Sequence, residues 1–379
     1  MADFSDLVDL AQLAQAMGKQ HVFLAQERCL PVRHRKARCR SCVEVCPAGA
    51  IEVSPNHIAV DHAACVGCCA CTTVCPTEAL VPLEPPDVKL EADLETLLAE
   101  AKQKNLPEGT VCIGCARKAA RHEVDDQAFL EVPCLCRMHE STLLSLMAKG
   151  ATDIVLVDGN CRTCKLNACG EVTDRVVENV AALTASKGVH SAVRRSSQFP
   201  EGMPPYQAQA LQASRRAFFT ASADQGKNAA AKTARFFIRK EAKKDTTVAA
   251  VLDSFGLTQE EESKITEPQR MTTLVDALYE VGLEPSGMVD SRFFGSLDLR
   301  TVKCSLCGVC AVVCPTKALS RCSGEAASAS GKKAFLSFWP SDCVQCHLCE
   351  DVCFRKCLTV NSEVPIDQVF SFEPQLIGK

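Results

Sequence analysis

Aromatic side chains are scarce in this sequence of 379 residues: they make up 5% of it, with one Trp and two Tyr. The chain also lacks an uncharged apolar run of the roughly 18 residues that a membrane-spanning helix needs. Neither a glycine-rich phosphate loop nor a His-Glu-x-x-His motif occurs. The net charge of −4 provides no bulk positive charge for nucleic acid. We therefore expect no membrane span, no nucleic-acid partner and no nucleotide-binding site.

The N-terminal residues do not have the pattern of an export signal. They begin with acidic residues and lack a basic region, an apolar core and a small-residue cleavage site. Their spacing is typical of an amphipathic helix, and we expect a helical segment over residues 1–28. The internal pair Arg215-Arg216 resembles a twin-arginine motif, but no apolar segment follows it. These features favour a cytoplasmic location.

Cysteine is in large excess, with 26 copies. Disulfides at this density belong mainly to small secreted domains, and the expected location argues against them. Closely spaced thiols that stay reduced are typically metal ligands. The cysteines fall in three blocks, over residues 29–75, 112–169 and 304–357. This distribution indicates three metal-bearing units and one cysteine-free connector.

The strongest motif is a run of four cysteines followed by proline, Cys65-x2-Cys68-x2-Cys71-x3-Cys75-Pro76. It recurs from Cys304 to Pro315 and again from Cys343 to Phe354, where phenylalanine replaces the proline. Three thiolates two residues apart hold three corners of one [4Fe–4S] cluster, and the fourth ligates a neighbouring cluster. A zinc ribbon needs only two Cys-x2-Cys pairs, so three full runs favour iron–sulfur clusters.

These runs resemble the two-cluster ferredoxins of bacteria, over residues 29–80 and 300–360. The resemblance implies an internal duplication, with α+β ferredoxin-like modules near both ends, over residues 29–86 and 300–379. It also implies two clusters in the C-terminal module. The ligands of the first would be Cys304, Cys307, Cys310 and Cys353. The ligands of the second would be Cys314, Cys343, Cys346 and Cys349.

The N-terminal module departs from the ferredoxin pattern at its first ligand position, where Lys36 stands. By the resemblance one cluster is still complete, with the ligands Cys46, Cys65, Cys68 and Cys71. The other keeps only three cysteine ligands, Cys39, Cys42 and Cys75. Cys29 could loop back as the fourth; otherwise the site holds a three-iron cluster, uses a non-cysteine ligand or is vacant. We therefore expect three [4Fe–4S] clusters, and four if Cys29 is a ligand.

The middle block alternates strand-like and helix-like segments. Strands are expected over residues 110–113, 129–132 and 153–158, and helices over 141–149 and 172–183. This alternation favours a small α/β domain with a parallel sheet, over residues 87–188. Its cysteines lie at or beside the ends of the expected strands, and ligands collect at the carboxyl ends of parallel strands.

Residues 110–170 resemble the delta subunits of methyl-viologen-reducing hydrogenase. The matching segments are Val111-Cys112-Ile113-Gly114-Cys115, Pro133-Cys134 and the run 149–161. That family relays electrons to heterodisulfide reductase and similar flavin-based bifurcating complexes. The resemblance implies a [2Fe–2S] cluster, with ligands drawn from Cys112 or Cys115, Cys134, Cys161 and Cys164.

Two departures from that family concern the same domain. The last cysteines are spaced Cys161-x2-Cys164-x4-Cys169, and Cys136 is an additional candidate ligand. A degenerate domain that keeps the fold without a cluster is one alternative. A catalytic dithiol is another, because a Cys-x2-Cys pair beside a strand end can be redox-active.

Residues 189–299 are expected to form a mainly helical connector. Within it, residues 215–244 carry nine basic residues against two acidic ones. A solvated helical face is the simpler interpretation, and a docking surface for an acidic partner subunit is the alternative. The leftover Cys69, Cys322 and Cys357 are expected to be packed thiols, although Cys322 or Cys357 could substitute as a ligand.

The motifs favour an electron-transfer subunit over an enzyme. In this hypothesis the N-terminal module, the central domain and the C-terminal module form a wire in series. It would relay electrons between a carrier such as ferredoxin and a catalytic or flavin-containing subunit of an anaerobic oxidoreductase complex, of hydrogenase, heterodisulfide reductase, bifurcating or molybdopterin type. The alternatives are a heterodisulfide- or thiol-reductase-like enzyme acting at the central domain, and a scaffold that delivers clusters.

Overall fold

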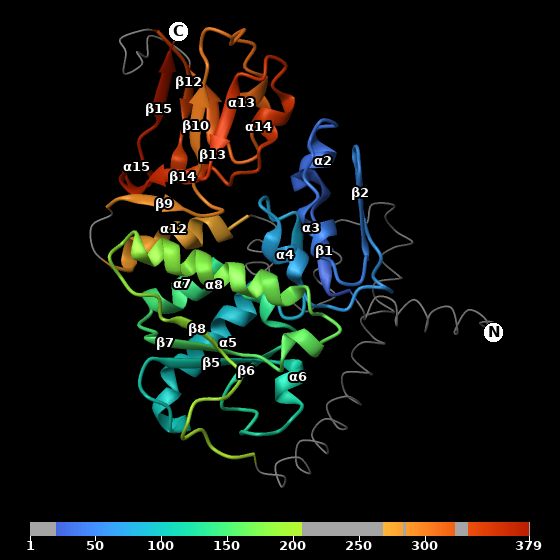
Figure 1. The fold of residues 1–379 in the computed structure, drawn as a ribbon, viewed down its shortest axis with the longest axis vertical. Coiled ribbons are helices and arrows are strands. Elements are labelled where there is room, and N and C mark those ends of the chain that lie inside the picture. The colour runs from blue at the N-terminus through green and yellow to red at the C-terminus, as the bar shows by residue number, and fades with distance from the viewer. Residues whose placement is uncertain (1–19, 207–267, 283–285, 323–332, 379) are drawn as a thin grey trace, which may run out of the picture.

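The computed structural model describes residues 20–206, 268–282, 286–322 and 333–378 (Figure 1). Residues 1–19 of the expected N-terminal helix and the basic segment 215–244 lie outside these ranges. We refer to residues 20–86 as the N-terminal module, to 87–206 as the central domain and to 286–378 as the C-terminal module. No helix in the described ranges is long and apolar enough to cross a membrane.

The N-terminal module pairs its first strand with its last. Strand β1 (Val22–Leu24) runs antiparallel to β4 (Leu80–Pro82), and β2 (Ile51–Ser54) forms a hairpin with β3 (His57–Val60). The hairpin turns at Asn56, which adopts a positive φ of 61° that asparagine tolerates. Residues 22–24 are therefore a strand of this module, although we expected them within the helical segment 1–28.

Short helices of the N-terminal module lie beside its cysteine runs. They are α2 (Leu30–Arg33), α3 (Ser41–Glu44) and α4 (Ala70–Val74). Proline follows the last cysteine of each run, at Pro47 and Pro76, where no backbone N–H is available to continue a helix.

The C-terminal module repeats the same strand pairing. Strand β10 (Ser296–Leu299) runs antiparallel to β13 (Leu358–Asn361), and β11 (Leu319–Arg321) runs antiparallel to β12 (Ala334–Phe338). In both modules the strand before the first cysteine run thus pairs with the strand after the second run, and the two strands between the runs pair with each other. Its helices are α13 (Val309–Val313), α14 (Leu348–Val352) and α15 (Ile366–Phe370).

Three further strands extend the C-terminal module. Strand β9 (Met288–Asp290) pairs with β14 (Glu363–Pro365), and β15 (Gln375–Gly378) pairs with β12. Strands β9 and β10 precede residue 300, in the segment where we expected a mainly helical connector. This part of the segment is extended, not helical.

The central domain contains a four-stranded parallel sheet in the order β6-β5-β7-β8. The strands are β5 (Thr110–Cys115), β6 (Leu130–Val132), β7 (Asp153–Val157) and β8 (Val193–Ser196). The side chains from Ile154 to Val157 are all fully buried, because packed residues cover both faces of the strand. Strand β8 lies beyond residue 188, so the sheet also extends into the expected connector.

Helices cover the sheet and link it to the C-terminal module. They are α5 (Asp87–Ala99), α6 (Ala116–Ala119), α7 (Glu140–Ala148), α8 (Cys169–Ala185) and α12 (Arg270–Glu280). Leu274 and Leu278 of α12 join the core formed by α7, α8 and the sheet, and Val289 of β9 and Val364 of β14 pack into it as well. The central domain and the C-terminal module therefore share one apolar core.

Short 3₁₀ helices complete the described structure. They are Gln26–Arg28, Ala101–Lys104, Leu135–Arg137, Cys161–Thr163 and Pro340–Asp342. Two of them, Leu135–Arg137 and Cys161–Thr163, contain cysteines of the central domain. They lie after β6 and β7, near the carboxyl edge of the parallel sheet.

Candidate metal centres

The first C-terminal group of thiols consists of Cys304, Cys307, Cys310 and Cys353. Burial, together with the nearby thiols of the other three, raises the pKa of Cys310 to about 11. The Sγ atoms of Cys353 and Cys357 lie 3.6 Å apart. Cys357, expected as a packed thiol, is therefore an immediate neighbour of this group.

The second C-terminal group consists of Cys314, Cys343, Cys346 and Cys349. Burial raises the pKa of Cys343 to about 11, with a further contribution from Cys314. Burial also raises the pKa of Cys349, as do the nearby thiols of Cys346, Cys343 and Cys314. In each group the fourth thiol comes from the other cysteine run, Cys353 in the first group and Cys314 in the second. The ferredoxin resemblance implies the same arrangement.

The first N-terminal group consists of Cys46, Cys65, Cys68 and Cys71. Burial raises the pKa of Cys65, and the thiols of Cys68 and Cys46 contribute. Burial likewise raises the pKa of Cys71, with contributions from several thiols that include Cys68 and Cys65. Gly67, in the same turn, has a φ of +67°, which glycine adopts without strain.

The second N-terminal group consists of Cys29, Cys39, Cys42 and Cys75. Burial, together with the nearby thiols of Cys75, Cys39 and Cys29, raises the pKa of Cys42 to about 12. Cys29 is 6% exposed and interacts with Cys75 and Cys39 in the same way. Lys36 is exposed. The structure thus brings Cys29 to the three cysteines that lack a fourth partner.

The cysteines of the central domain do not all come together. Cys112 and Cys115 lie on opposite faces of β5, because Cys115 joins the core with α7 and α8 while Cys112 packs with Val155 and Val157. Burial raises the pKa of Cys112 to about 12, with no other thiol involved. Of these two alternatives, Cys115 lies at the carboxyl end of β5, on the same edge as the cysteines that follow β6 and β7.

Cys134 and Cys161 are neighbours beyond the ends of β6 and β7. Burial raises the pKa of Cys161, and Asp158, Arg195 and Cys134 also act on it. Arg195 Nη2 lies 3.3 Å from the Cys161 Sγ atom. The Sγ atom of Cys164 accepts a hydrogen bond from the Leu166 N–H at 3.4 Å.

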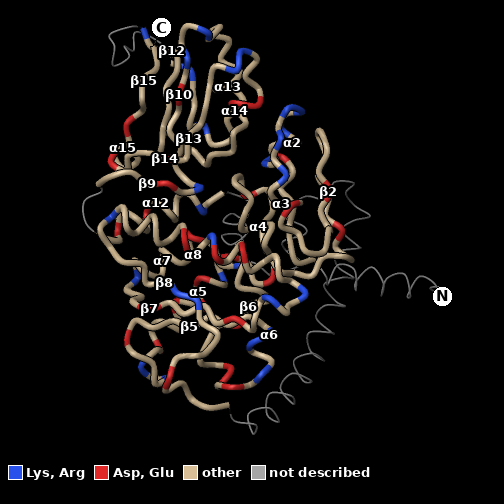
Figure 2. Tube along the Cα trace, viewed as in Figure 1, with Lys and Arg blue, Asp and Glu red and all other residues tan. Residues whose placement is uncertain are grey.

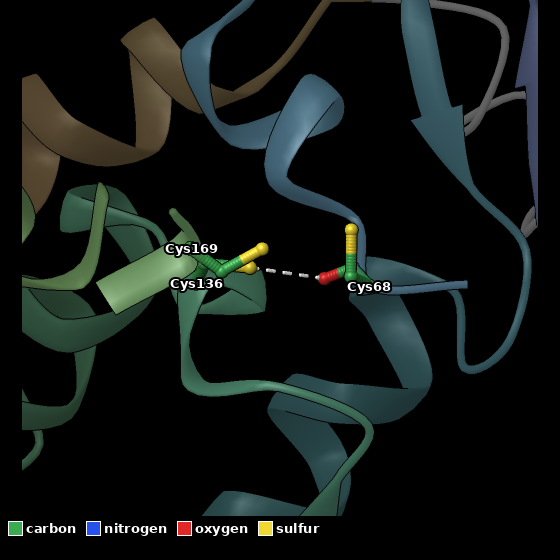
Figure 3. A group of neighbouring side chains, drawn as sticks. All are labelled: Cys68, Cys136 and Cys169. Carbon is green, nitrogen blue, oxygen red and sulfur yellow. Dashed lines mark hydrogen bonds between the residues drawn. The ribbon is translucent and has the colours of Figure 1, made fainter. Parts of the chain in front are cut away.

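One group of thiols joins the central domain to the N-terminal module (Figure 3). The Sγ atoms of Cys68, Cys136 and Cys169 all lie within 4.8 Å of one another, and all three residues are buried. Sequence reasoning gave Cys136 only as an additional candidate and gave Cys169 no ligand role. One signal in the sequence could have indicated this group: the central domain has more cysteines than the spacing of the hydrogenase delta subunits requires.

The two modules also contact each other directly, beside α2 and α14 (Figure 1). Leu30 of α2 packs with Leu348 and Val352 of α14, and Cys39 and Cys346 line the same apolar contact. Burial raises the pKa of Cys346 to about 12, and the Cys39 thiol of the other module contributes. The N-terminal and C-terminal cysteine groups therefore meet without the central domain between them, which differs from the expected series.

The parts of the molecule do not differ in the sign of their charge, since basic and acidic residues are interspersed over all of them (Figure 2). One local exception is the segment from Arg28 to Arg40, which carries Arg33, Arg35, Lys36 and Arg38. This basic segment includes α2 and lies beside the C-terminal module.

Comparison with known proteins identifies one domain. Residues 300–320 match the 4Fe–4S binding domain family, and this stretch contains Cys304, Cys307, Cys310 and Cys314. The uncharacterized ferredoxin-like protein YdhY of Escherichia coli K12 is 48% identical over 44 residues, which are 11% of this chain and 21% of YdhY. A ferredoxin of Alicyclobacillus acidocaldarius is 40% identical over 43 residues, 11% of this chain and 55% of that protein.

The chain therefore spans about a fifth of YdhY and about half of the ferredoxin. These matches support at least one [4Fe–4S] cluster and an iron–sulfur protein of the electron-transfer kind. A set of cysteine thiols at this spacing has the donor chemistry that such a cluster requires.

Proposed function

We propose that this chain is an electron-transfer subunit that holds four [4Fe–4S] clusters. What supports the proposal is the match of residues 300–320 to the 4Fe–4S binding domain family, together with the neighbouring thiols of the cysteine runs in both modules. Cys29 would complete the set of Cys39, Cys42 and Cys75. Each bound cluster would supply one-electron transfer, and the protein would set its potential through burial and hydrogen bonds to sulfur.

Backbone N–H groups already point at several of these sulfur atoms. The Ala50 N–H donates to Cys46 Sγ at 3.3 Å, and the Ala79 N–H donates to Cys75 Sγ at 3.2 Å. The Leu306 N–H donates to Cys304 Sγ at 3.4 Å. Such bonds favour the thiolate form that binds iron and stabilise the more negative, reduced state of a cluster.

The contact between Cys39 and Cys346 suggests the order of electron flow through the chain. Electrons would pass directly between the second group of each module, because these residues lie on one apolar contact. The central domain would then be a branch at the first N-terminal group, which it meets through Cys68. The predicted [2Fe–2S] cluster would have to use Cys134 and Cys161, since Cys112 faces the other side of the sheet.

The partners follow from the resemblances. We propose a cytoplasmic complex in which this chain connects an electron carrier such as ferredoxin to a catalytic or flavin-containing subunit, of the hydrogenase or heterodisulfide reductase kind. A thiol reductase acting at Cys136 or Cys169 is disfavoured. Both side chains are fully buried, so a substrate disulfide has no access to them.

The test is to purify the full chain anaerobically and to count its clusters by iron analysis and Mössbauer spectroscopy. Four [4Fe–4S] clusters that dithionite reduces, with no turnover of a small disulfide substrate, are expected. Anaerobic affinity purification from the native host should then recover a flavin- or metal-containing partner. Robust disulfide reduction by the isolated chain, or a chain without [4Fe–4S] clusters, would contradict the proposal.

A further inference from the structure

The thiols of Cys68, Cys136 and Cys169 come from three separate elements of two parts of the molecule. Cys68 lies in the turn before α4 of the N-terminal module, Cys136 lies in the 3₁₀ helix after β6, and Cys169 is the first residue of α8. Figure 3 shows Cys136 and Cys169 side by side, facing Cys68. The Cys136 thiol donates to the Cys68 carbonyl oxygen at 3.2 Å.

A fourth thiol, Cys134, belongs to the same group. Its thiol makes side-chain hydrogen bonds with those of Cys136 and Cys169, beside the three Sγ atoms that lie within 4.8 Å of one another. Thiols are weak donors, so four of them packed together gain little from one another alone. A bound cation would stabilise them far more strongly.

The junction around these thiols is apolar and fixed in position. Ala70 and Val172 are buried in it, and Val45, Val74 and Leu166 pack around them. The Thr73 hydroxyl of α4 donates to the Cys136 carbonyl oxygen at 2.6 Å, so the backbone beside the thiols is tied to the other module. Cys169 is the first residue of the 17-residue helix α8, so its position is fixed by that helix.

The separation of the sulfur atoms distinguishes between kinds of centre. Thiolates about 2.3 Å from one tetrahedral metal ion lie about 3.8 Å apart. Thiolates on different irons of a cluster lie further apart, because the irons and sulfides stand between them. Three Sγ atoms mutually within 4.8 Å therefore suit a single ion better than the corners of a [4Fe–4S] cluster.

We propose that Cys68, Cys134, Cys136 and Cys169 hold a single thiophilic metal ion, zinc or iron, at the junction between the N-terminal module and the central domain, in place of a [2Fe–2S] cluster, which would compete for Cys134. A buried all-sulfur donor set selects such ions over hard cations. Cys68 also belongs to the group with Cys46, Cys65 and Cys71. Its thiolate, which has more than one lone pair, would bridge the ion and the [4Fe–4S] cluster there; this bridging clause rests on the proposed function.

The consequence for the molecule is a cross-link between its parts. The ion would tie α4 to α8, as structural metal ions tie the halves of small domains. With iron bound, the bridge would also connect the N-terminal cluster electronically to the central domain. With zinc bound, it would be structural only.

The first test uses cobalt(II) as the probe. The full chain, purified anaerobically, is treated with a chelator and then with Co²⁺, and cobalt is counted per chain alongside cluster iron. One Co²⁺ with an intense sulfur-to-cobalt charge-transfer band is expected in the wild type and in the control Cys112→Ser. Cys136→Ser and Cys169→Ser should lose this Co²⁺ and keep their [4Fe–4S] clusters.

Metal analysis of the untreated wild type identifies the native ion, with a ferric tetrathiolate EPR signal for iron and no signal for zinc. X-ray absorption at the cobalt edge of the Co²⁺-loaded wild type, which no cluster iron shares, needs no variant and should give only sulfur neighbours at about 2.3 Å. Nitrogen or oxygen ligands would overturn the proposal. So would unchanged Co²⁺ in Cys136→Ser, a Cys136–Cys169 disulfide, or the loss of a whole cluster in Cys136→Ser. One Co²⁺ bound to a chain that lacks clusters would remove the bridge and the proposed function but keep the ion site.

Discussion

Arg38 and Asp351 join the two cysteine-rich modules through two hydrogen bonds to one carboxylate. The Arg38 backbone N–H donates to Asp351 Oδ2 at 2.9 Å, and its Nε donates to Oδ1 at 2.6 Å. The Asp351 side chain is 5% exposed, while that of Arg38 is 78% exposed. Because Asp351 lies between Cys349 and Cys353 and Arg38 precedes Cys39, this pair aligns the cysteine groups of the two modules.

Asp351→Ala should loosen the contact between the modules more than Arg38→Ala does. The aspartate change removes both hydrogen bonds, and bonds to charged groups contribute about 1.5–3 kcal/mol each. The arginine change removes only the exposed ion pair, worth less than about 1 kcal/mol. Hydrogen exchange at the Arg38 amide should therefore accelerate about tenfold or more in Asp351→Ala.

The control is Asp342→Ala, which removes an exposed carboxylate from the same module. It should leave exchange at Arg38 unchanged. Equal exchange in Asp351→Ala and the wild type would show that this contact does not hold the modules together in solution.

Cys29→Ser should lower the count of [4Fe–4S] clusters from four to three. The thiol of Cys29 is the one that the structure brings to Cys39, Cys42 and Cys75. Iron analysis and EPR of the reduced chain measure the count, and Cys322→Ser is the matched control.

A second change makes this test specific to the ligand role. Lys36→Cys in the Cys29→Ser background restores the three-cysteine spacing of the other runs, and should restore the fourth cluster. If Cys29→Ser keeps all four clusters, Cys29 is a packed thiol.

The sequence was informative where the chemistry is local. The run of apolar residues from Ile154 to Val157 predicts a buried strand, and β7 is found there. The four-cysteine runs specify their own spacing, and one of them lies within the matched 4Fe–4S binding domain. The apolar run and the cysteine runs each lie within a short segment of the chain, so both can be recognised without any knowledge of tertiary contacts.

The features that the sequence did not predict depend on distant partners. Strand β1 is only three residues long, and its pairing with β4 defines it as a strand. The contact of Arg38 with Asp351, and that of Cys68 with Cys169, likewise join segments far apart in the chain. Each residue in these pairs is locally unremarkable, so periodicity and spacing carry no signal for them.

Asp87→Asn should destabilise the junction between α12 and the central domain, where Asp87 of α5 lies between Arg270 and Arg137. Asp87 Oδ2 lies 3.0 Å from Arg270 Nη2, and Oδ1 lies 2.6 Å from Arg137 Nη2. Both arginine side chains are buried, at 9% and 0% exposure, so the change leaves two buried cations without their carboxylate. Removing one partner of a buried pair costs about 3–5 kcal/mol, and about 2–3 kcal/mol is expected because Asp87 is partly exposed.

The pH dependence of this effect has a definite sign. Burial alone would raise the pKa of Asp87, but Arg270 and Arg137 outweigh it and lower the pKa to about 2. The stabilisation is therefore complete above the ordinary pKa of 3.8 and is lost as the pH falls toward 2. Urea unfolding should show the same deficit in Asp87→Asn at pH 6 and pH 8, and little in Asp93→Asn. A deficit that disappears between those pH values would contradict the ion pairing.

Cys112→Ala should show the opposite pH dependence, on the alkaline side. Cys112 is 1% exposed, and burial raises its pKa from 9.0 to about 12. A thiol with a raised pKa in the folded state stabilises the fold below pH 9.0, and this contribution is lost as the pH rises toward 12. At pH 7 the alanine variant should be about 1 kcal/mol less stable than the wild type, because it leaves a small cavity. By pH 10.5 this difference should shrink or reverse, since only the wild type must keep a neutral thiol buried. Urea unfolding at both pH values measures it, and a difference that stays constant would mean that Cys112 is already ionised or ligated in the folded chain.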